Sequence, residues 1–554
     1  MLKDGQLYIA HSENGNINMI GKMANRHGLI AGATGTGKTV TLQVLAETFS
    51  QVGVPCFMAD MKGDLSGISQ AGKISGFIEK RMPEFGIENP QFAGCPTRFF
   101  DVFGEQGFPM RATVSAMGPQ LLARLMQLTE VQAGVLNALF RIADDNNLLL
   151  IDLKDLKLML NFVGQNAAQF TTEYGNIAPA SVGAIQRAVL QIESEGGDKF
   201  FGEPAFDVND LFAVENGRGV MNVLAADKLM LNPKLYSTYL LWLMTELYAT
   251  LPEVGDLDLP KFVFFFDEAH MLFDGTSKAL VDKIEQVIRL IRSKGVGIYF
   301  ITQVPSDVPV NVLAQLSNRV QHARRAYTPQ DQKAVRAAAQ TFRANPAFRT
   351  EDAILDLGTG EALVSFLDEK GAPSVVERAK ILFPLSQIGA ITPGQRYDIQ
   401  AAAPQKLKDY EKFFDRESAY EMLTEAAQKA EEEAEKERKA LEKQKEKELK
   451  EKEREKEKKA KSSKKGGVGR TILGTMIAAA ATSFARSAGT RIAKNIGGSS
   501  TKKSTSSKSS TAKKSSTTKK SSTSLGSAAK KATKSAVNTA TRKVTTEILK
   551  SIFK

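Results

Sequence analysis

The chain has 554 residues, of which 42% are apolar and 25% charged, enough for two or three domains around a large core. Its two cysteines, Cys56 and Cys95, have no metal-ligand spacing and no second pair beside them, so the chain is not a small disulfide-stapled protein and a reducing compartment is indicated. The N-terminus lacks an apolar signal segment, and no run of about 18 apolar residues occurs. We therefore expect a cytoplasmic protein without a transmembrane segment.

The net charge of +12 is unevenly distributed along the chain. Residues 426–554 carry 34 Lys and Arg against 13 Glu, a net charge of +21, whereas the preceding residues carry 40 basic and 49 acidic side chains, a net charge of −9. An argument from bulk charge for a polyanionic partner such as nucleic acid therefore applies to the C-terminal tail alone.

Residues 1 to about 400 alternate between strand and helix patterns, which predicts an α/β fold with a mainly parallel sheet covered by helices on both faces. Several predicted strands are continuously apolar, as buried parallel strands are. They comprise residues 28–31, 54–60, 219–225, 261–266, 296–302 and 361–367. Between about 115 and 200 the pattern changes to amphipathic helices, which indicates a helical insertion between core strands.

The first chemical motif is a phosphate-loop pattern, G-x-x-x-x-G-K-[ST], between a predicted strand and a predicted helix. It consists of Gly32, Ala33, Thr34, Gly35, Thr36, Gly37, Lys38 and Thr39. Backbone N–H groups of such a loop point at phosphates, the Lys38 ammonium reaches the β and γ oxygens, and the Thr39 hydroxyl ligates Mg²⁺. The segment therefore predicts binding of a nucleoside triphosphate.

An apolar strand that ends in two carboxylates supplies the second half of a nucleotide site. Residues 262–266 are followed by Asp267 and Glu268, the Walker B pattern. We expect Asp267 to hold Mg²⁺ through its water shell and Glu268 to polarise the attacking water, although a strand that merely ends in surface carboxylates is the alternative. A carboxylate base beside the metal ligand predicts hydrolysis, because no acceptor motif of a phosphotransferase is visible.

Polar residues at both ends of the predicted strand 296–302 are further candidates. Gln303 follows the strand and can orient water or sense the γ-phosphate, because an amide donates and accepts; the alternative is an ordinary strand-end side chain. Upstream, either Arg289 or Arg292 can reach a neighbouring subunit's nucleotide as an arginine finger, or be a solvated helix charge. The pattern alone leaves these alternatives open.

Other polar groups have less defined predicted roles. His270 can relay the state of the γ-phosphate or be structural. His322 and three nearby arginines can line a phosphate or DNA path, or be strand-edge charge. The three are Arg319, Arg324 and Arg325. The turn 60–64 follows a core strand, where such sheets place ligands, so it can touch nucleotide or DNA, with a plain polar turn as the default.

The chain changes character after about residue 405. Residues 405–465 are dense in Glu, Lys and Arg at helical spacing, which predicts a charged helical spacer. An amphipathic helix is predicted over 466–498, too interrupted by basic residues to cross a bilayer. Residues 499–524 are Ser, Thr and Lys repeats that we expect to be disordered, and a basic helix over 525–554 closes the chain.

In their order along the chain, these motifs resemble the HerA-like ATPases of the HerA and FtsK superfamily, specifically the bacterial proteins described as helicase HerA-like, C-terminal domain. The resemblance covers about residues 5 to 395. The matching segments are 32–39, 60–64, 265–270, 292–295, 303–309, 326–335 and 357–362. The resemblance implies a RecA-like core, ATP and Mg²⁺ as cofactors, and a homo-oligomeric ring, expected to be a hexamer. It also implies that Arg292 is the finger acting in trans and Gln303 the sensor.

Three functions remain open at the level of sequence. The resemblance implies ATP-driven movement along a polymer, usually duplex DNA, with residues 1–400 as the motor. The alternative is an ATP-driven scaffold or polypeptide-handling ATPase that its basic tail recruits to protein partners or a membrane surface. The third is that the basic tail binds a membrane surface or RNA, with the ATPase as a switch. Archaeal HerA proteins carry an N-terminal barrel, and we expect none here because the phosphate loop begins at residue 32.

Overall fold

A computed structural model describes residues 2–3, 5–255, 257–274 and 278–462. The chain divides into two compact units, Met1–Glu425 and Ala426–Lys554. Among the described helices, none combines the length and apolar character that a bilayer crossing requires.

The first unit is built on a 13-stranded sheet whose central part is parallel. In spatial order the parallel strands are β13 (Asn318–His322), β4 (Gly28–Ala31), β12 (Val296–Thr302), β11 (Phe262–Phe266), β5 (Cys56–Asp60), β10 (Met221–Ala225), β6 (Thr97–Asp101) and β7 (Phe108–Pro109). The middle strands are buried along their whole length. This arrangement confirms the predicted mainly parallel sheet.

An antiparallel extension continues the sheet beyond β13. It consists of β14 (Glu361–Ser365), β15 (Glu377–Ile381) and β2 (Gln6–Ser12), with β1 (Leu2–Lys3) and β3 (Gly15–Met19) paired to β2. A separate hairpin joins β8 (Val214–Glu215) to β9 (Arg218–Gly219). The predicted strand 361–367 is thus present as β14, but it runs antiparallel to its neighbours.

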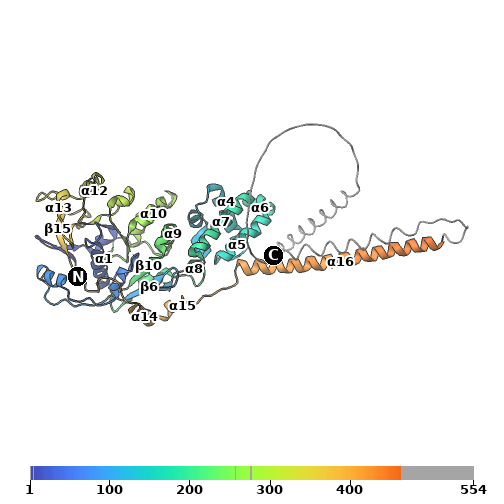
Figure 1. The fold of residues 1–554 in the computed structure, drawn as a ribbon, viewed down its shortest axis with the longest axis horizontal. Coiled ribbons are helices and arrows are strands. Elements are labelled where there is room, and N and C mark those ends of the chain that lie inside the picture. Colours follow the sequence, from blue (N-terminus) through green and yellow to red (C-terminus); the bar gives the residue numbers. More distant parts are fainter. Residues whose placement is uncertain (1, 4, 256, 275–277, 463–554) are drawn as a thin grey trace, which may run out of the picture. The chain divides into compact units, whose positions relative to one another are not determined.

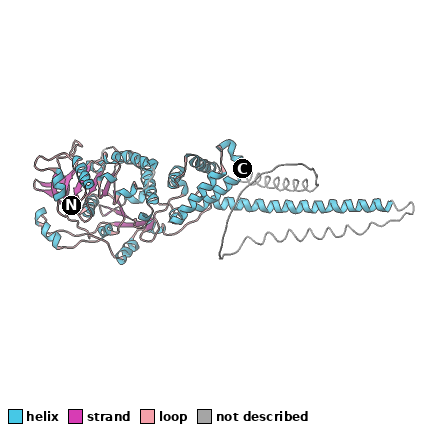
Figure 2. Ribbon diagram, turned by 45° about the horizontal axis from the view of Figure 1, so that its top comes forward, coloured by secondary structure: helices cyan, strands magenta, loops and turns pink. Residues whose placement is uncertain are grey.

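Helices surround the strands of the sheet (Figures 1 and 2). Those outside the predicted insertion are α1 (Lys38–Gln51), α2 (Gly76–Arg81), α9 (Pro233–Thr250), α10 (Lys278–Ile291), α11 (Val310–Leu313), α12 (Pro329–Gln340), α13 (Thr350–Asp356), α14 (Pro393–Ala402) and α15 (Gln405–Asp409). The 3-10 turns are η1 (Gly21–Arg26), η2 (Asp64–Ser69), η3 (Pro83–Phe85), η5 (Val208–Phe212), η6 (Leu229–Leu231), η7 (Ala269–Leu272), η8 (Arg292–Lys294) and η9 (Pro305–Asp307).

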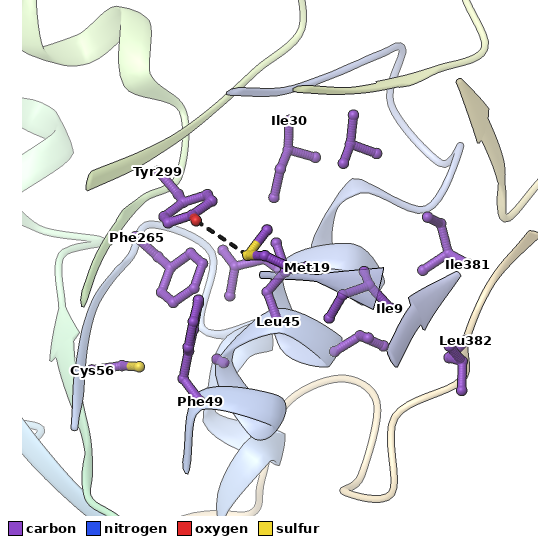
Figure 3. Close-up of a cluster of buried hydrophobic side chains, with 14 of the residues drawn as sticks. Ile9, Met19, Ile30, Leu45, Phe49, Cys56, Phe265, Tyr299, Ile381 and Leu382 are labelled. Carbon is purple, nitrogen blue, oxygen red and sulfur yellow. Dashed lines mark hydrogen bonds between the residues drawn. The ribbon is translucent and has the colours of Figure 1, made fainter. Parts of the chain in front are cut away.

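Alternation of side chains along the central strands creates two apolar faces. On one face, Phe49 of α1 contacts Phe265 and Tyr299, with ring centroids 6.3 and 6.1 Å apart (Figure 3). On the other face, Phe266 stacks on Phe300 at 5.6 Å, and Phe273 contacts Phe300 edge-on. Helix α10 packs against β12 and α9. The sheet is therefore covered on both faces, which confirms the predicted architecture.

Between β7 and β8 the chain forms a group of helices that lies beside the sheet in both views (Figures 1 and 2). They are α3 (Val114–Leu125), α4 (Glu130–Asp145), α5 (Leu153–Gln165), α6 (Ala167–Tyr174), α7 (Pro179–Ile192), the π-helix η4 (Glu193–Gly197) and α8 (Asp198–Phe200). Capping boxes that begin at Thr129 and Asp152 fix the starts of α4 and α5. Contacts between α3 and α9 join the group to the sheet.

Helix α16 (Ala419–Ser462) contains most of the charged sequence after residue 405. Exposed pairs spaced i,i+4 stabilise it, such as Glu435 with Lys439 at 2.9 Å and Glu446 with Lys450 at 2.8 Å. The predicted segments 466–498, 499–524 and 525–554 lie outside the described residues.

Candidate functional site

The phosphate loop curves between β4 and α1 through glycines with positive φ. Gly32, Gly35 and Gly37 have φ of 154°, 76° and 115°. A Cβ on Gly32 would lie 2.5 Å from the Cβ of His322, whereas one on Gly35 would meet no described atom within 4 Å. The loop thus packs on the sheet at its first glycine and opens toward solvent at its second.

The Lys38 ammonium lies across the loop. Its Nζ donates to the carbonyl oxygens of Gly32 at 2.7 Å and Ala33 at 3.1 Å. Burial lowers the pKa of Lys38, while the nearby carboxylates of Glu268 and Asp267 act in the opposite direction. Because two neutral carbonyls are its hydrogen-bond acceptors, phosphate oxygens that replaced them would form stronger, charge-assisted bonds.

His322 links α1, the helix that follows the phosphate loop, to strand β14 of the sheet. It is fully buried, its Nδ1 lies 2.9 Å from the carbonyl oxygen of Glu361, and its Nε2 lies 2.7 Å from the Thr41 hydroxyl. Burial lowers the pKa of His322 to about 4, so the ring is neutral at pH 7, with Nδ1 as donor and Nε2 as acceptor. These contacts favour the structural alternative for His322 over a phosphate or DNA path.

The loop after α13, residues 357–360, contacts the phosphate loop. The sequence matches segment 357–362 to the HerA-like family, but it did not predict this contact. The Gly360 N–H donates to the Thr36 carbonyl at 2.9 Å. Arg81 of α2 in turn donates to the carbonyl oxygens of Gly360 at 3.0 Å and Thr359 at 2.9 Å. The guanidinium therefore supports the phosphate loop through the second loop, without contacting it directly.

The three arginines near His322 have separate environments. Arg319 donates to the carbonyl oxygens of Leu316 and Leu313, and Arg325 donates to that of Leu355. Arg324 is buried next to Ala323, whose carbonyl accepts from the Ala33 N–H of the phosphate loop. Its Nη1 has no hydrogen-bond partner among the described residues. Of the three, Arg324 is the one that follows a residue bonded to the phosphate loop and has a buried donor without a partner among the described residues.

Register places the second half of the predicted site beside the phosphate loop. Ala31 of β4 pairs with Thr302 of β12, and Phe300 of β12 pairs with Phe266 of β11. Gln303 therefore follows the strand next to Gly32, and Asp267 and Glu268 follow the next strand along. The loop, the acidic pair and Gln303 share one carboxyl edge of the sheet, with the Gln303 side chain exposed.

Asp267 has the surroundings of a cation ligand. One carboxylate oxygen, Oδ1, accepts from the Glu268 N–H at 3.0 Å, whereas Oδ2 is buried and has no hydrogen-bond partner among the described residues. Burial, with the charge of Glu268, raises the pKa of Asp267 to about 6. Together with the half-buried Thr39 hydroxyl at the start of α1, this oxygen fits a hard cation such as Mg²⁺.

Glu268 is held in a strained backbone conformation with φ of 47° and ψ of 52°. Its Oε1 contacts Lys62 Nζ at 2.5 Å, and its Oε2 lies 3.5 Å from His270 Nδ1. Burial opposes ionisation, but the hydrogen bond and charge of Lys62 outweigh it and hold the pKa of Glu268 below its usual range. Glu268 is therefore a carboxylate at neutral pH.

The turn after β5 delivers Lys62 to the acidic pair. Asp60 Oδ1 accepts from the N–H groups of Gly63 at 2.7 Å and Lys62 at 3.3 Å, which fixes the turn. Burial, with the charge of Asp64, raises the pKa of Asp60 to about 7. The turn that the sequence analysis left as plain polar structure or a ligand contact thus contacts Glu268.

Arg292 lies at the opposite, amino edge of the sheet. It begins the turn before β12 and, with Arg26 and Arg289, lines a cavity of about 500 Å³. His27 forms part of the same lining; its Nε2 donates to the Ile288 carbonyl at 2.9 Å, and burial lowers its pKa to about 4. Since β12 separates Arg292 from Gln303, the structure does not bring Arg292 to the phosphate loop of its own chain.

Comparison with known proteins identifies one family and several similar structures. A family model described as "Helicase HerA-like C-terminal" matches residues 6–504. No curated protein matches the chain. Among solved structures, the unbound bacterial conjugative coupling protein TrwBdeltaN70 is 15% identical, with a TM-score of 0.45 over 68% of this chain and 89% of that one.

Two further solved structures are similar to the same extent. VirB4 of Thermoanaerobacter pseudethanolicus is 14% identical, with a TM-score of 0.45 over 71% of this chain and 99% of that one. Plasmid coupling protein TrwB in complex with ADP and Mg²⁺ is 16% identical, with a TM-score of 0.44 over 67% of this chain and 88% of that one.

Proposed function

The chain belongs to the helicase HerA-like C-terminal family, and on this premise we propose that it is an ATP-hydrolysing, ring-forming motor that translocates on or unwinds double-stranded DNA. One observation carries the proposal of hydrolysis. The buried Oδ2 of Asp267, which has no hydrogen-bond partner within the described residues, and the carboxylate of Glu268 lie at the same sheet edge as the phosphate loop. ATP and Mg²⁺ are the proposed ligands, and the similar TrwB was solved with ADP and Mg²⁺.

The residues at this edge divide the work of hydrolysis. Lys38 leaves its two carbonyl acceptors and binds the β and γ oxygens of ATP. Thr39 and Asp267 would hold Mg²⁺, which when bound would supply positive charge that stabilises the developing negative charge of the phosphates. Glu268 accepts a proton from a water whose oxygen attacks the γ-phosphorus, as the bond to the β,γ-bridging oxygen breaks and ADP leaves. Gln303 orients that water.

Arg292 acts in trans in this proposal. Its position at the amino edge of the sheet directs it away from its own phosphate loop. In a ring of head-to-tail copies, one subunit can present its amino edge to the carboxyl edge of the next. Arg292 then stabilises the charge that develops on the transferring phosphoryl group.

Duplex DNA is the proposed polymer because the chain belongs to the HerA-like family. The charge distribution along the chain supports a different substrate, a polypeptide. Residues before 426 have a net charge of −9, which favours a polypeptide-handling or scaffolding ATPase recruited through the basic tail to a protein or membrane surface. Cytoplasmic location is part of the proposal.

The deciding experiment measures steady-state ATPase rates of the full chain with and without duplex DNA, together with native mass in the presence of nucleotide. We expect hydrolysis that Lys38→Ala abolishes, stimulation by DNA, and the mass of a hexamer. Hydrolysis that no nucleic acid changes would remove the DNA part and favour the polypeptide-handling alternative. A nucleotide-bound monomer would remove the ring.

A further inference from the structure

His27, the residue before β4, connects the two segments that flank Arg292. Its Nδ1 accepts from the backbone N–H of Ile298 in β12 at 3.0 Å, and its Nε2 donates to the carbonyl oxygen of Ile288 in α10 at 2.9 Å. Ile288 lies in the last turn of the helix before Arg292, and Ile298 lies in the strand that follows it. One imidazole ring therefore holds the backbone on both sides of this arginine.

The ring bonds to backbone groups that regular structure leaves over. In the last turn of a helix such as α10, which contains Ile288, carbonyl oxygens lack N–H partners within the helix. The pairing of β12 with β4 begins at Tyr299, opposite Gly28, so the N–H of Ile298 lies one residue before that pairing starts. The same imidazole thus extends the hydrogen bonding of β12 by one residue and caps the end of α10.

The backbone at His27 is strained, and the residue is enclosed. Its φ of 58° and ψ of 167° lie in a region that glycine occupies almost alone, and the residue is 2% exposed. Strain of this kind persists where surrounding contacts hold it, and it clusters at functional sites. A glycine would remove the strain but also both ring contacts, so what a histidine adds here is the link between β12 and α10.

His27 and Arg292 line the same cavity at the amino edge of the sheet. Burial lowers the pKa of His27 to about 4, and the positive charge of Arg292 acts in the same direction. The ring is therefore neutral beside the guanidinium at pH 7. A neutral imidazole has one donor and one acceptor, which are the two groups that the contacts with β12 and α10 require.

Resting on the proposed function, we propose that His27 is a positioning residue for Arg292, which holds the backbone on both sides of the arginine and so fixes where its guanidinium meets the neighbouring subunit's nucleotide. Arg292 begins a short 3-10 turn, whose hydrogen-bond geometry is poorer than that of an α-helix. A misplacement of a catalytic group by about 1 Å can cost about 100-fold in rate. The His27 link thus supplies rigidity that the turn itself lacks.

The test is a double-mutant cycle on kcat with the full chain. His27→Ala keeps the Cβ, and with it the backbone strain, but removes the ring. We expect it to lower kcat about 100-fold with KM for ATP unchanged, because the phosphate loop lies at the opposite edge. In an Arg292→Ala background the same substitution should change kcat by less than about twofold, because no guanidinium is left to position.

Asn222→Ala is the matched control. The buried Asn222 amide of β10 donates to the carbonyl oxygens of Cys56 and Leu211, at 3.0 Å each, so it also links two segments through one polar side chain. Its loss should lower the melting temperature, as the loss of the His27 ring does, but leave kcat within about twofold of the wild type. If His27→Ala does not fold, His27→Gly removes both the ring and the strain and takes its place in the cycle.

Mixed rings supply a readout that a purely structural role would not change. When His27→Ala is mixed with Lys38→Ala, some intact phosphate loops meet a neighbour in which both His27 and Arg292 are intact. We expect the mixture to recover part of the lost activity. No recovery, an equal effect of His27→Ala with and without Arg292, an unchanged kcat, or an equal loss of kcat in Asn222→Ala overturns the positioning role.

Failure of the proposed function gives different results in the same experiment. A wild type that hydrolyses no ATP overturns the proposed hydrolysis, and wild-type turnover of Arg292→Ala overturns the proposed finger. Either result removes the basis of the inference, whatever His27→Ala does. A low kcat of both single variants, with effects that do not add in the double variant, supports the finger and its positioning together.

Discussion

The two ends of the central parallel strands differ in charge and in the chemistry they support. The carboxyl edge presents a phosphate loop and an acidic pair in which two oxygens, Asp267 Oδ2 and Glu268 Oε2, have no hydrogen-bond partner among the described residues. The amino edge presents a cavity lined by three arginines. The seven residues of β12 span about 23 Å between these edges. One chain therefore carries both halves of the proposed hydrolytic site at opposite edges and cannot join them by itself.

The largest expected effect comes from the amino edge. Arg292→Ala should lower kcat about 1000-fold, because an arginine finger stabilises charge in the transition state. Mixing this variant with Lys38→Ala should restore part of the activity, since some interfaces then combine an intact phosphate loop with an intact Arg292. Arg289→Ala, in the same cavity, is the control. Wild-type turnover of Arg292→Ala would show that Arg292 has no part in hydrolysis, and absent complementation would argue against action in trans.

The acidic pair of the carboxyl edge gives the next effect. Glu268→Gln should lower kcat about 100-fold, because an amide cannot accept the proton of the attacking water. Nucleotide affinity should persist, since Lys38 and Asp267 are unchanged. Rapid-quench rates with a fluorescent nucleotide titration separate these quantities. Near-normal turnover would show that another group is the base.

Asp60, at the carboxyl edge, makes the free energy of unfolding depend on pH. Burial raises the pKa of Asp60 from 3.8 to about 7, so the unfolded chain ionises first and the folded protein loses stability as pH rises between these values. Asp60→Asn keeps the oxygen that accepts the turn's N–H groups. The substitution should raise the free energy of unfolding at pH 8 by about 2 kcal/mol. This is less than the free energy equivalent of the whole pKa shift, because burying an amide also has a desolvation cost. Urea unfolding in the absence of Mg²⁺ should show about half this gain at pH 5.5. An equal gain at both pH values would contradict the assignment.

The smallest effect concerns loop 357–360, which contacts the phosphate loop. Gly360 has φ of 74°, and a Cβ there would meet Arg81 Nη2 at 3.1 Å, so Gly360→Ala should destabilise the protein by about 1 kcal/mol. Gly371→Ala is the matched control, with φ of 75° and no described atom within 4 Å of the added Cβ. Melting temperatures should fall for both variants, and nucleotide affinity only for Gly360→Ala. Equal affinities would mean that loop 357–360 does not support the phosphate loop.

Local pattern accounted well for the buried core of the fold. Strands such as 262–266 and 296–302 are apolar throughout, and the structure has them as β11 and β12. Strand β13 escaped prediction because its sequence, Asn-Arg-Val-Gln-His, is polar, and only its neighbours bury it. The sequence did not predict the direction of β14 either. Helices α12 and α13 pack on each other and bring the chain back to the carboxyl edge, where β13 ended, so β14 runs antiparallel to β13.

The candidate site was predictable where its residues are close in sequence, as in the phosphate loop and the pair Asp267 and Glu268. The contacts of Lys62 with Glu268 and of Arg81 with Gly360 depend on which strands and loops are neighbours, and no local pattern encodes strand order. The available signal was the position of the turn 60–64 at the end of a core strand, which indicates proximity to the site without naming a partner. The roles of Gln303 and Arg292 stay predictions.

Strand β12 has a mechanical consequence. It is buried along all seven residues and hydrogen-bonded on both sides, by β4 and β11, so it can neither stretch nor bend appreciably. Arg292 precedes one end and Gln303 follows the other. In the proposed ring, Arg292 contacts the nucleotide of one neighbour. A displacement of Arg292 therefore also displaces Gln303, because rigid β12 connects the two residues. Hydrolysis in one subunit can then shift Gln303 in the site of its neighbour. This coupling favours sequential hydrolysis around the proposed ring.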